Sequence, residues 1–138
     1  MKFIVLVFFS FLSIPLCVSQ EWNGHFSYNN SIDTSIGNGK IFTASENAIY
    51  IYSTSTDQLE EISTIDGLSG DFISNIHYSS NFNKLLIGYE NGLLQIVDFN
   101  SDSVLTIYDI IEKQTIAPNK KKINELTESG DIIYIATD

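Results

Sequence analysis

The chain has 138 residues, of which 43% are hydrophobic and 12% aromatic, a composition that suits one ordinary globular domain. It has 17 acidic side chains and seven basic ones, all of them lysine, which give a formal net charge of -10. This negative field repels polyphosphates and excludes nucleic-acid binding through a basic surface. The single cysteine, Cys17, excludes an internal disulfide framework and a cysteine-based zinc site within this chain.

The segment from Met1 to Ser19 has the layout of a secretory signal peptide: Lys2, an apolar run, and then a more polar stretch that contains Pro15. It is too short and too interrupted for a membrane anchor, which needs about 20 continuous apolar residues. We expect cleavage after Ser19, which leaves six lysines against 17 acidic residues and no cysteine. Lipidation of Cys17 is the alternative, but the bulky Leu16 before it argues against that modification.

After Glu21, the chain is rich in isoleucine, valine, leucine, phenylalanine and tyrosine, and turn-forming residues recur every several positions. This composition predicts an all-β fold, because no stretch sustains the apolar spacing of a helix. The predicted strands, in chain order, are Ile41-Ser45, Ile49-Ser53, Leu59-Ser63, Ile73-Tyr78, Leu85-Tyr89, Leu93-Asp98, Val104-Tyr108, Ile123-Thr127 and Ile132-Thr137. Consecutive apolar residues, as in Leu85-Ile87, indicate burial on both faces of a sheet.

Three short segments predict tight turns between these strands. Asn91-Gly92 separates two strands and has the residue types that accept a positive φ in a hairpin. Gly37-Asn38-Gly39 and Ser129-Gly130-Asp131 mark two more turns. Because no predicted helix follows Gly37-Asn38-Gly39, this glycine-rich segment is not a phosphate-binding loop.

The predicted strands repeat along the chain. Residues 41–48 align with residues 85–92 and again with 133–138, at offsets of 44 and 48 positions. A companion strand, Ile73-Ile76, matches Ile123-Leu126, and Ile32 begins a degenerate first copy. A period in the forties with about four short strands is typical of one propeller blade. A single β-sandwich with coincidental similarity is the alternative.

The predicted fold is therefore an incomplete β-propeller with about two to three blades. The 119 residues after the signal peptide hold fewer than three repeats, whereas closed propellers have roughly four to eight blades. The chain also stops at Asp138, in the middle of the third copy. We expect residues 20–138 to be the amino-terminal part of a propeller domain that is truncated within its third repeat.

The motif from Thr64 to Gly70, followed by Ile73-Ile76 and Leu85-Leu93, resembles the "two-component regulator propeller" repeat, with Leu86 and Tyr89 departing from its usual tryptophan and threonine. A narrower resemblance, to the PorZ family of Bacteroidota, rests on the order of several short motifs. These are Trp22-Tyr28, Ser45-Ala48, Gly67-Ser69, Gly88-Gly92, Asp109-Ile110 and Lys121-Asn124.

The PorZ resemblance implies a non-enzymatic component of the type IX secretion system, exported to the periplasm or the outer-membrane cell surface. The family has two propellers and a carboxy-terminal sorting domain. The implied partners are PorU-, PorV- and PorQ-like proteins and, in addition, anionic lipopolysaccharide; no cofactor is implied. The alternative function is the ligand-sensing periplasmic propeller of a hybrid two-component regulator.

The chemically interesting side chains do not form a recognisable site. His25 and His77 are the only histidines, and their separation of 52 positions argues against a metal or acid–base site. His25, next to Trp22 and Phe26, is expected to be a packing residue. Asp98, Asp102 and Asp109 lack the spacing of a calcium loop and are expected in turns. The only basic cluster, residues 120–122, is expected in a solvated loop, with an anionic-glycan contact as the alternative. The sequence therefore predicts no catalytic, cofactor-binding or metal-ligating residue.

Overall fold

The computed structural model describes residues 30–138, which form three antiparallel sheets. The first sheet contains β1 (Asp33–Gly37), β2 (Lys40–Ala44), β3 (Ile49–Ser53) and β4 (Gln58–Ile62). The second contains β5 (Ile73–Ser79), β6 (Lys84–Tyr89), β7 (Leu94–Asp98) and β8 (Ser103–Ile107), and the third contains β9 (Ile123–Ser129) and β10 (Ile132–Thr137). Three short helical turns connect them: η1 (Thr64–Asp66), α2 (Asp109–Glu112) and η2 (Pro118–Lys120).

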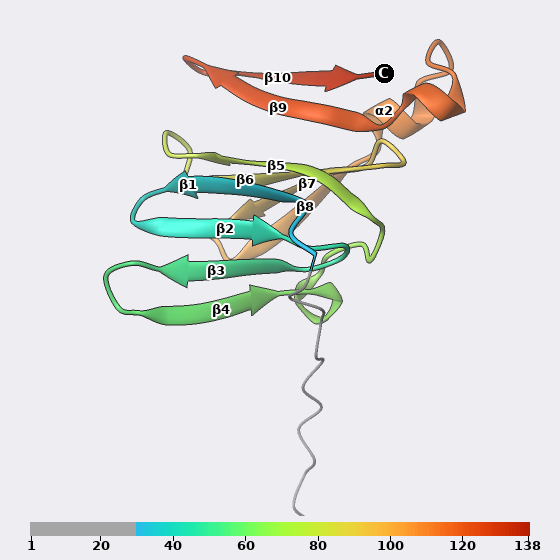
Figure 1. The fold of residues 1–138 in the computed structure, drawn as a ribbon. Coiled ribbons are helices and arrows are strands. Elements are labelled where there is room, and N and C mark those ends of the chain that lie inside the picture. Colours follow the sequence, from blue (N-terminus) through green and yellow to red (C-terminus); the bar gives the residue numbers. More distant parts are fainter. Residues whose placement is uncertain (1–29) are drawn as a thin grey trace, which may run out of the picture.

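The three sheets lie face to face in chain order (Figure 1), and the first strand of each sheet contacts the first strand of the next. Thus β1 contacts β5, and β5 contacts β9, whereas β4 and β8 lie at the far edges of their sheets. Four antiparallel strands paired in sequential order, with successive inner strands side by side, are the architecture of propeller blades. The structure confirms the predicted all-β, incomplete propeller rather than a single sandwich.

The core lies between the blades. On β6, Leu85, Ile87 and Tyr89 belong to the apolar cluster shared with the first blade, whose members include Phe42 and Ile51. The intervening Leu86 belongs to a second cluster, shared with Ile123 and Leu126 of the third blade. Since β6 is covered on both faces, its apolar residues are consecutive, as the sequence predicts.

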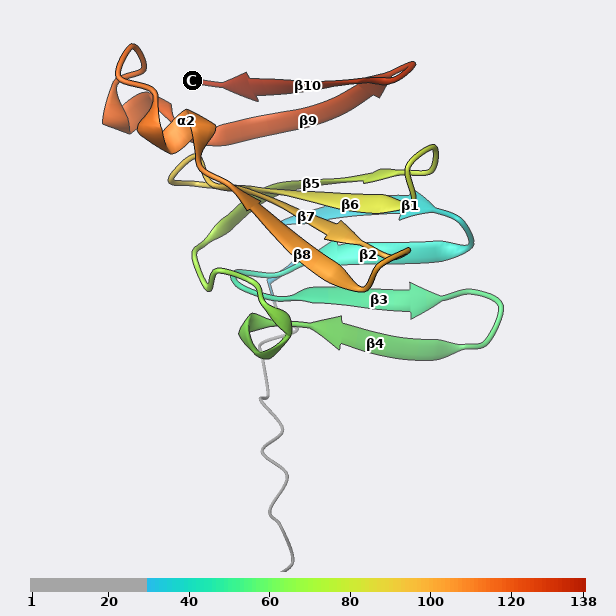
Figure 2. The same ribbon diagram turned by 180° about the vertical axis from the view of Figure 1, so that it is seen from behind.

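The connections divide between two ends of the blades (Figure 2). The turns that join β1 to β2, β3 to β4, β5 to β6, β7 to β8 and β9 to β10 occupy one end, here called the hairpin end. There, Asn38 and Gly39 both have a positive φ (51° and 70°), as a two-residue hairpin requires, which confirms the predicted β1–β2 turn. The opposite end, here called the loop end, carries the long connections with η1, α2 and η2 as well as the predicted Asn91-Gly92 turn.

Two features differ from the sequence-based expectation. The degenerate first copy, which was expected to begin at Ile32 but was not assigned a strand, contains the complete inner strand β1. The one-turn helix α2 and the two 3-10 turns lie in segments where no helix was expected, because none is long enough to show a helical period. The predicted signal peptide lies outside the described residues, as do His25 and the aromatic residues of the 22–28 motif.

Candidate functional site

Polar side chains join the inner strands of successive blades. The Asp33 carboxylate oxygen Oδ2 accepts hydrogen bonds from the Asn75 amide nitrogen, at 2.7 Å, and from the Ile76 backbone N–H, at 2.8 Å. The Asn75 carbonyl oxygen in turn accepts the Leu126 backbone N–H at 2.8 Å. Asn75 is therefore bonded to the blade before it and to the blade after it.

Two hydroxyl groups add to these inter-blade contacts. Ser35 Oγ accepts the Tyr78 backbone N–H at 2.9 Å, and Ser74 Oγ donates to the Ile123 carbonyl at 2.6 Å. In each case the side chain belongs to the earlier blade and the main chain to the later one. Because these main-chain groups lie on strand edges that have no further strand to pair with, the side chains satisfy groups that would otherwise lack a protein partner.

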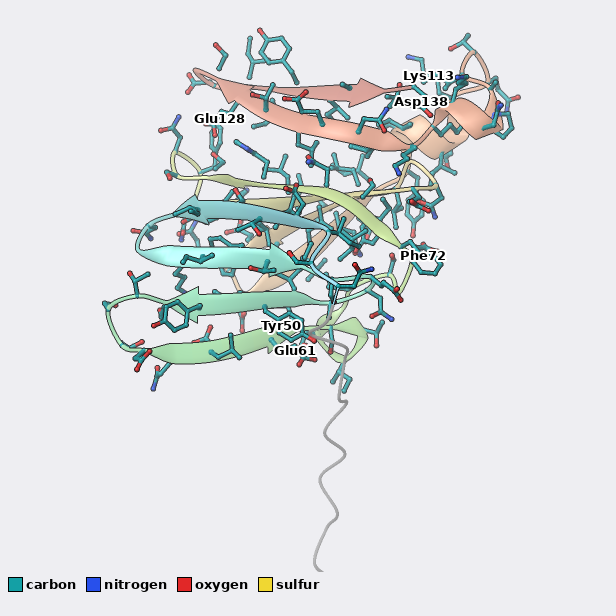
Figure 3. All side chains as sticks on the ribbon, in the orientation of Figure 1. Tyr50, Glu61, Phe72, Lys113, Glu128 and Asp138 are labelled. Atoms are coloured by element: carbon teal, nitrogen blue, oxygen red, sulfur yellow. The ribbon has the colours of Figure 1, made fainter. Side chains whose placement is uncertain are left out.

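His77 takes part in a polar cluster at the hairpin end, between the second and third blades. Its Nε2 lies 3.4 Å from Glu128 Oε2, and Asn81 donates to the other Glu128 oxygen at 2.8 Å. Hydrogen bonds from Ser79, Asn81 and His77 hold the pKa of Glu128 below its usual range. Figure 3 shows Glu128 at the hairpin end of β9, above the β5–β6 turn. The cluster thus fastens two blades together.

A buried glutamine positions the Gly67-Leu68-Ser69 turn at the loop end. Gln95, which is 2% exposed, accepts the Ser69 backbone N–H at 3.0 Å and the Tyr89 hydroxyl at 2.5 Å. Its amide nitrogen donates to the Gly67 carbonyl at 3.2 Å and to Thr106 Oγ1 at 2.9 Å. Burial raises the pKa of Tyr89 to about 12, so this phenol stays neutral. Two hydrogen bonds from one side chain therefore hold the turn, and two more, to Tyr89 and Thr106, fix the position of that side chain.

The three aspartates do not come together. Asp98 Oδ1 accepts the Asn100 backbone N–H and its Oδ2 pairs with Lys84 at 3.2 Å, contacts that lower the Asp98 pKa. Asp102 lies in the β7–β8 turn with φ of 51°, and Asp109 begins α2. Within residues 30–138, no group of three or more His, Cys, Asp or Glu side chains could hold a metal ion.

The lysine cluster is divided by its local contacts. Lys120 ends η2, while the Lys121 ammonium donates to the Ile111 carbonyl. Lys122 Nζ lies 3.1 Å from Glu90 Oε1, in an exposed ion pair. The ammonium groups of Lys121 and Lys122 are therefore engaged in local contacts, and the cluster does not form a continuous basic patch.

A cleft of about 230 Å³ lies between the outer parts of the first two blades. Four of its lining residues are acidic: Glu60, Glu61, Asp66 and Asp102. Buried apolar side chains, among them Ile51 and Val97, also line it. Four carboxylates in one cleft repel anions, so this side of the molecule does not suit an anionic glycan.

The loop end presents large apolar side chains to solvent. Ile65 is 75% exposed, Phe72 60% and Tyr108 53%. Their backbones are held firmly: Ser63 and Asp66 form a capping box around η1, and the Phe72 carbonyl accepts the Glu90 N–H at 3.0 Å. Figure 3 shows Phe72 projecting at this end. Ile65, Phe72 and Tyr108 are called the loop-end apolar residues below.

Comparison with known proteins identifies the family. The sequence profile of the type IX secretion system protein PorZ, N-terminal β-propeller domain, matches residues 41–138. The chain belongs to this family. The PorZ match confirms the resemblance seen in the ordered sequence motifs, and it covers all three blades from β2 onward.

A solved PorZ structure from Porphyromonas gingivalis has the same fold as this PorZ-family chain, with a TM-score of 0.71 and 22% sequence identity. The alignment covers 83% of this chain and 15% of the solved one, so the chain spans about a seventh of that protein's length. The solved protein is described as an essential bacterial surface component of the type IX secretion system. No curated protein sequence matches the chain. No helix within the described part of the chain is long and apolar enough to cross a membrane.

Sequence reasoning missed the residues that join the blades and the one that holds the loop-end turn. Asp33, Asn75 and Gln95 have no catalytic spacing and belong to no motif that was singled out for chemistry. One signal was available: when the repeats are aligned, Asp33, Asn75 and Glu125 fall at equivalent strand positions, and all three side chains carry an oxygen that can accept a hydrogen bond. A repeated acceptor on an inner strand indicates a structural role between blades.

Proposed function

We propose that this chain is part of a non-enzymatic PorZ-type propeller that acts in type IX secretion through protein contacts at the cell surface. The observation that carries the proposal is the family match over residues 41–138. The signal peptide expected over Met1 to Ser19 supports an exported protein. The expected partners are the PorU-, PorV- and PorQ-like components of the same system.

The loop-end apolar residues support contact with protein rather than with an anionic glycan. The backbones of Ile65 and Phe72 are already ordered by hydrogen bonds, so binding there needs little further ordering of the main chain, and exposed apolar side chains occur at protein interfaces. The chain carries a net charge of -10, which repels anionic lipopolysaccharide. Protein contacts are therefore favoured as the principal binding mode.

The proposal is tested first by deletion of the complete gene in the source bacterium. Cargo proteins should then keep their sorting domains and accumulate in the periplasm, because the surface machinery that processes them lacks one component. The measurement is immunoblotting of periplasmic and surface fractions for a tagged cargo. Normal cargo maturation in the deletion strain would contradict a role in type IX secretion.

The contact surface is tested by Ile65→Ser and Phe72→Ser in the full-length protein. Both changes should leave the unfolding temperature unchanged, since the side chains are largely exposed, but should reduce co-purification with the tagged PorU-like component several-fold. Leu59→Ser is the matched control, because Leu59 is 58% exposed on β4, away from the loop-end apolar residues. Equal co-purification by all three variants would show that this surface is not used.

A further inference from the structure

The outer strand of the second blade has one edge without a strand partner among residues 30–138. Strand β8 pairs with β7 over five consecutive residues without a register shift, and no strand lies on its other side. The Phe99 N–H donates to the Asn83 carbonyl, and hydrogen-bonded positions alternate along antiparallel strands, so Val97 also bonds β6. Its partner on β8, Val104, therefore directs its backbone N–H and C=O outward, as does Thr106 two residues later.

Strand β8 also lacks the features that usually keep an edge strand from pairing with another chain. Charged side chains, prolines and bulges serve this purpose in natural sheets. The outer strand of the first blade, β4, carries two charged residues, Glu60 and Glu61. Strand β8 has the sequence Ser-Val-Leu-Thr-Ile, with no charge, no proline and three β-branched residues. Its free edge is therefore suited to accept a further strand.

The acidic cleft between the first two blades lies beside this edge. It is lined by residues 60–62 of β4 and by residues 102–104 at the turn into β8, and Figure 2 shows both strands as the last of their sheets. Glu60 lies opposite the buried Ile51, so its side chain is on the face of the first blade that the second blade covers. Val104 packs against the core between these blades. A strand added to β8 would therefore direct every second side chain, on the face of Val104, toward the cleft.

The charge of the cleft indicates the chemistry of such a strand. Glu60 and Asp102 are exposed carboxylates, and no described basic residue lines the cleft. The buried side chains of Ile51 and Val97 supply apolar surface in the same cleft. Lysine and arginine match both features, because their methylene stems pack on apolar surface while the charged group stays in water near carboxylates. The complementary strand therefore has a basic residue at every second position.

We propose that the free edge of β8 binds an extended, basic segment of a partner protein as an additional antiparallel strand. The backbone of the segment exchanges hydrogen bonds with Val104 and Thr106, and its alternate lysine or arginine side chains lie in the cleft near Glu60 and Asp102. Pairing with the backbone supplies affinity, and the cleft selects basic over acidic segments.

Two features of the chain bear on the choice of this occupant. A second copy of the chain does not fit, because β8 itself has no basic residue and the chain has a net charge of -10. The edge of β8 is also a different surface from the loop-end apolar residues. The proposal therefore goes beyond the contacts inferred for that end and does not depend on a role in secretion.

Peptide binding to the full-length protein tests the strand pairing. The probe is a fluorescein-labelled peptide of about seven residues in which lysine alternates with valine, long enough to cover a five-residue strand. In the proposed antiparallel register the lysines lie opposite Val104 and Thr106, so their own N–H groups face β8 and the valine N–H groups face away. Fluorescence anisotropy should show saturable binding that falls several-fold on N-methylation of the lysine amides but not of the valine amides. Equal binding of the two methylated peptides, or no saturable binding of the probe, would overturn the proposal.

The role of the cleft is tested by changing charge on both sides. A peptide with glutamate in place of lysine should not bind. On the protein, Asp102→Asn should weaken binding of the lysine peptide several-fold, and Glu60→Gln should add to the loss. Asp57→Asn is the matched control and should leave binding unchanged, because Asp57 and Asp102 are both exposed turn residues with positive φ, a backbone that asparagine tolerates. Binding that is unchanged by Asp102→Asn and Glu60→Gln together would contradict the proposed site.

Hydrogen exchange of the full-length protein shows whether the peptide uses β8 itself. Saturation with the lysine peptide should slow amide exchange in residues 103–107 several-fold and leave residues 58–62 of β4 unchanged, because only the β8 edge gains hydrogen bonds. Equal exchange of β8 with and without bound peptide would overturn the proposal. Slower exchange of β8 at high protein concentration without peptide would also overturn it, because the occupant would then be a second molecule.

Discussion

Asn75 is the residue whose replacement tests the inter-blade network most sharply. In Asn75→Ala the Leu126 N–H loses its acceptor although Leu126 is only 4% exposed, and an unsatisfied buried donor costs about 1 to 3 kcal/mol. The lost bond to the Asp33 carboxylate contributes about 1.5 to 3 kcal/mol in its own right. Because the two losses overlap, we expect the free energy of unfolding to fall by about 3 kcal/mol.

A second variant separates the two bonds. Asn75→Asp keeps an acceptor for Leu126 but places a carboxylate about one hydrogen-bond length from Asp33, where two like charges repel by roughly 4 kcal/mol at the effective dielectric of a protein surface. At pH 7 this variant should therefore be as unstable as Asn75→Ala. As the pH falls toward 4, a proton shared by the two carboxyl groups should restore its stability, while Asn75→Ala gains nothing.

The assay is hydrogen exchange of the full-length protein as a function of pH, analysed for peptides that cover β5 and β9, together with urea unfolding. Asn119→Ala, in the exposed turn η2, controls for removal of an asparagine side chain. The reasoning would be refuted if Asn75→Ala stayed within about 0.5 kcal/mol of the wild type, the usual range for surface changes. If the stability loss of Asn75→Asp did not change with pH, repulsion between its carboxylate and that of Asp33 would not be the cause.

Three further predictions concern packing, the loop-end turn and pH. Gly88→Ala should destabilise the protein by about 1 to 3 kcal/mol in urea unfolding, because its Cβ would overlap Ile123 Cγ2. Because Ile123→Ala removes that Cγ2 atom, the double variant should lose less stability than the sum of the two single variants. Gln95→Ala should accelerate amide exchange of Ser69 several-fold without changing exchange in β9, which lies away from that turn. Because hydrogen bonds lower the folded-state pKa of Glu128, its contribution to stability is present above the ordinary pKa of glutamate and is lost as the pH falls through the lowered value. Glu128→Gln should therefore flatten the acid limb of the stability curve, and an unchanged limb would contradict the assignment.

The central strands could be predicted from sequence because they are buried on both sides. β6 is apolar at consecutive positions, and its copies in β2 and β10 gave the repeat its period. Strand β1 could not be predicted in the same way: Asp33 and Ser35 are polar because they bond the main chain of the next inner strand, so alternation of apolar residues is absent. A strand and its register can be predicted from sequence where burial makes its residues apolar. They cannot be predicted in the same way where the residues are polar because they form hydrogen bonds.

The inter-blade contacts depend on residues far apart in sequence. Asn75 reaches Leu126, 51 positions later, and Gln95 reaches back to Gly67, 28 positions earlier. No local pattern encodes such a pair, because the spacing is set by the intervening loops, which differ in length between blades. The exposure of the loop-end apolar residues could not be predicted either, because the sequence alone does not distinguish an exposed Ile65 or Phe72 from a core residue.

The direction of the inter-blade hydrogen bonds has a consequence for how the domain assembles. In the bonds made by Asp33, Ser35, Ser74 and Asn75, the side chain lies on the earlier blade and the main-chain group on the later one. A blade that has just been synthesised therefore displays a ready set of polar groups to the chain that follows. Each blade can therefore serve as the template for its successor, so the blades can assemble in the order in which they are synthesised.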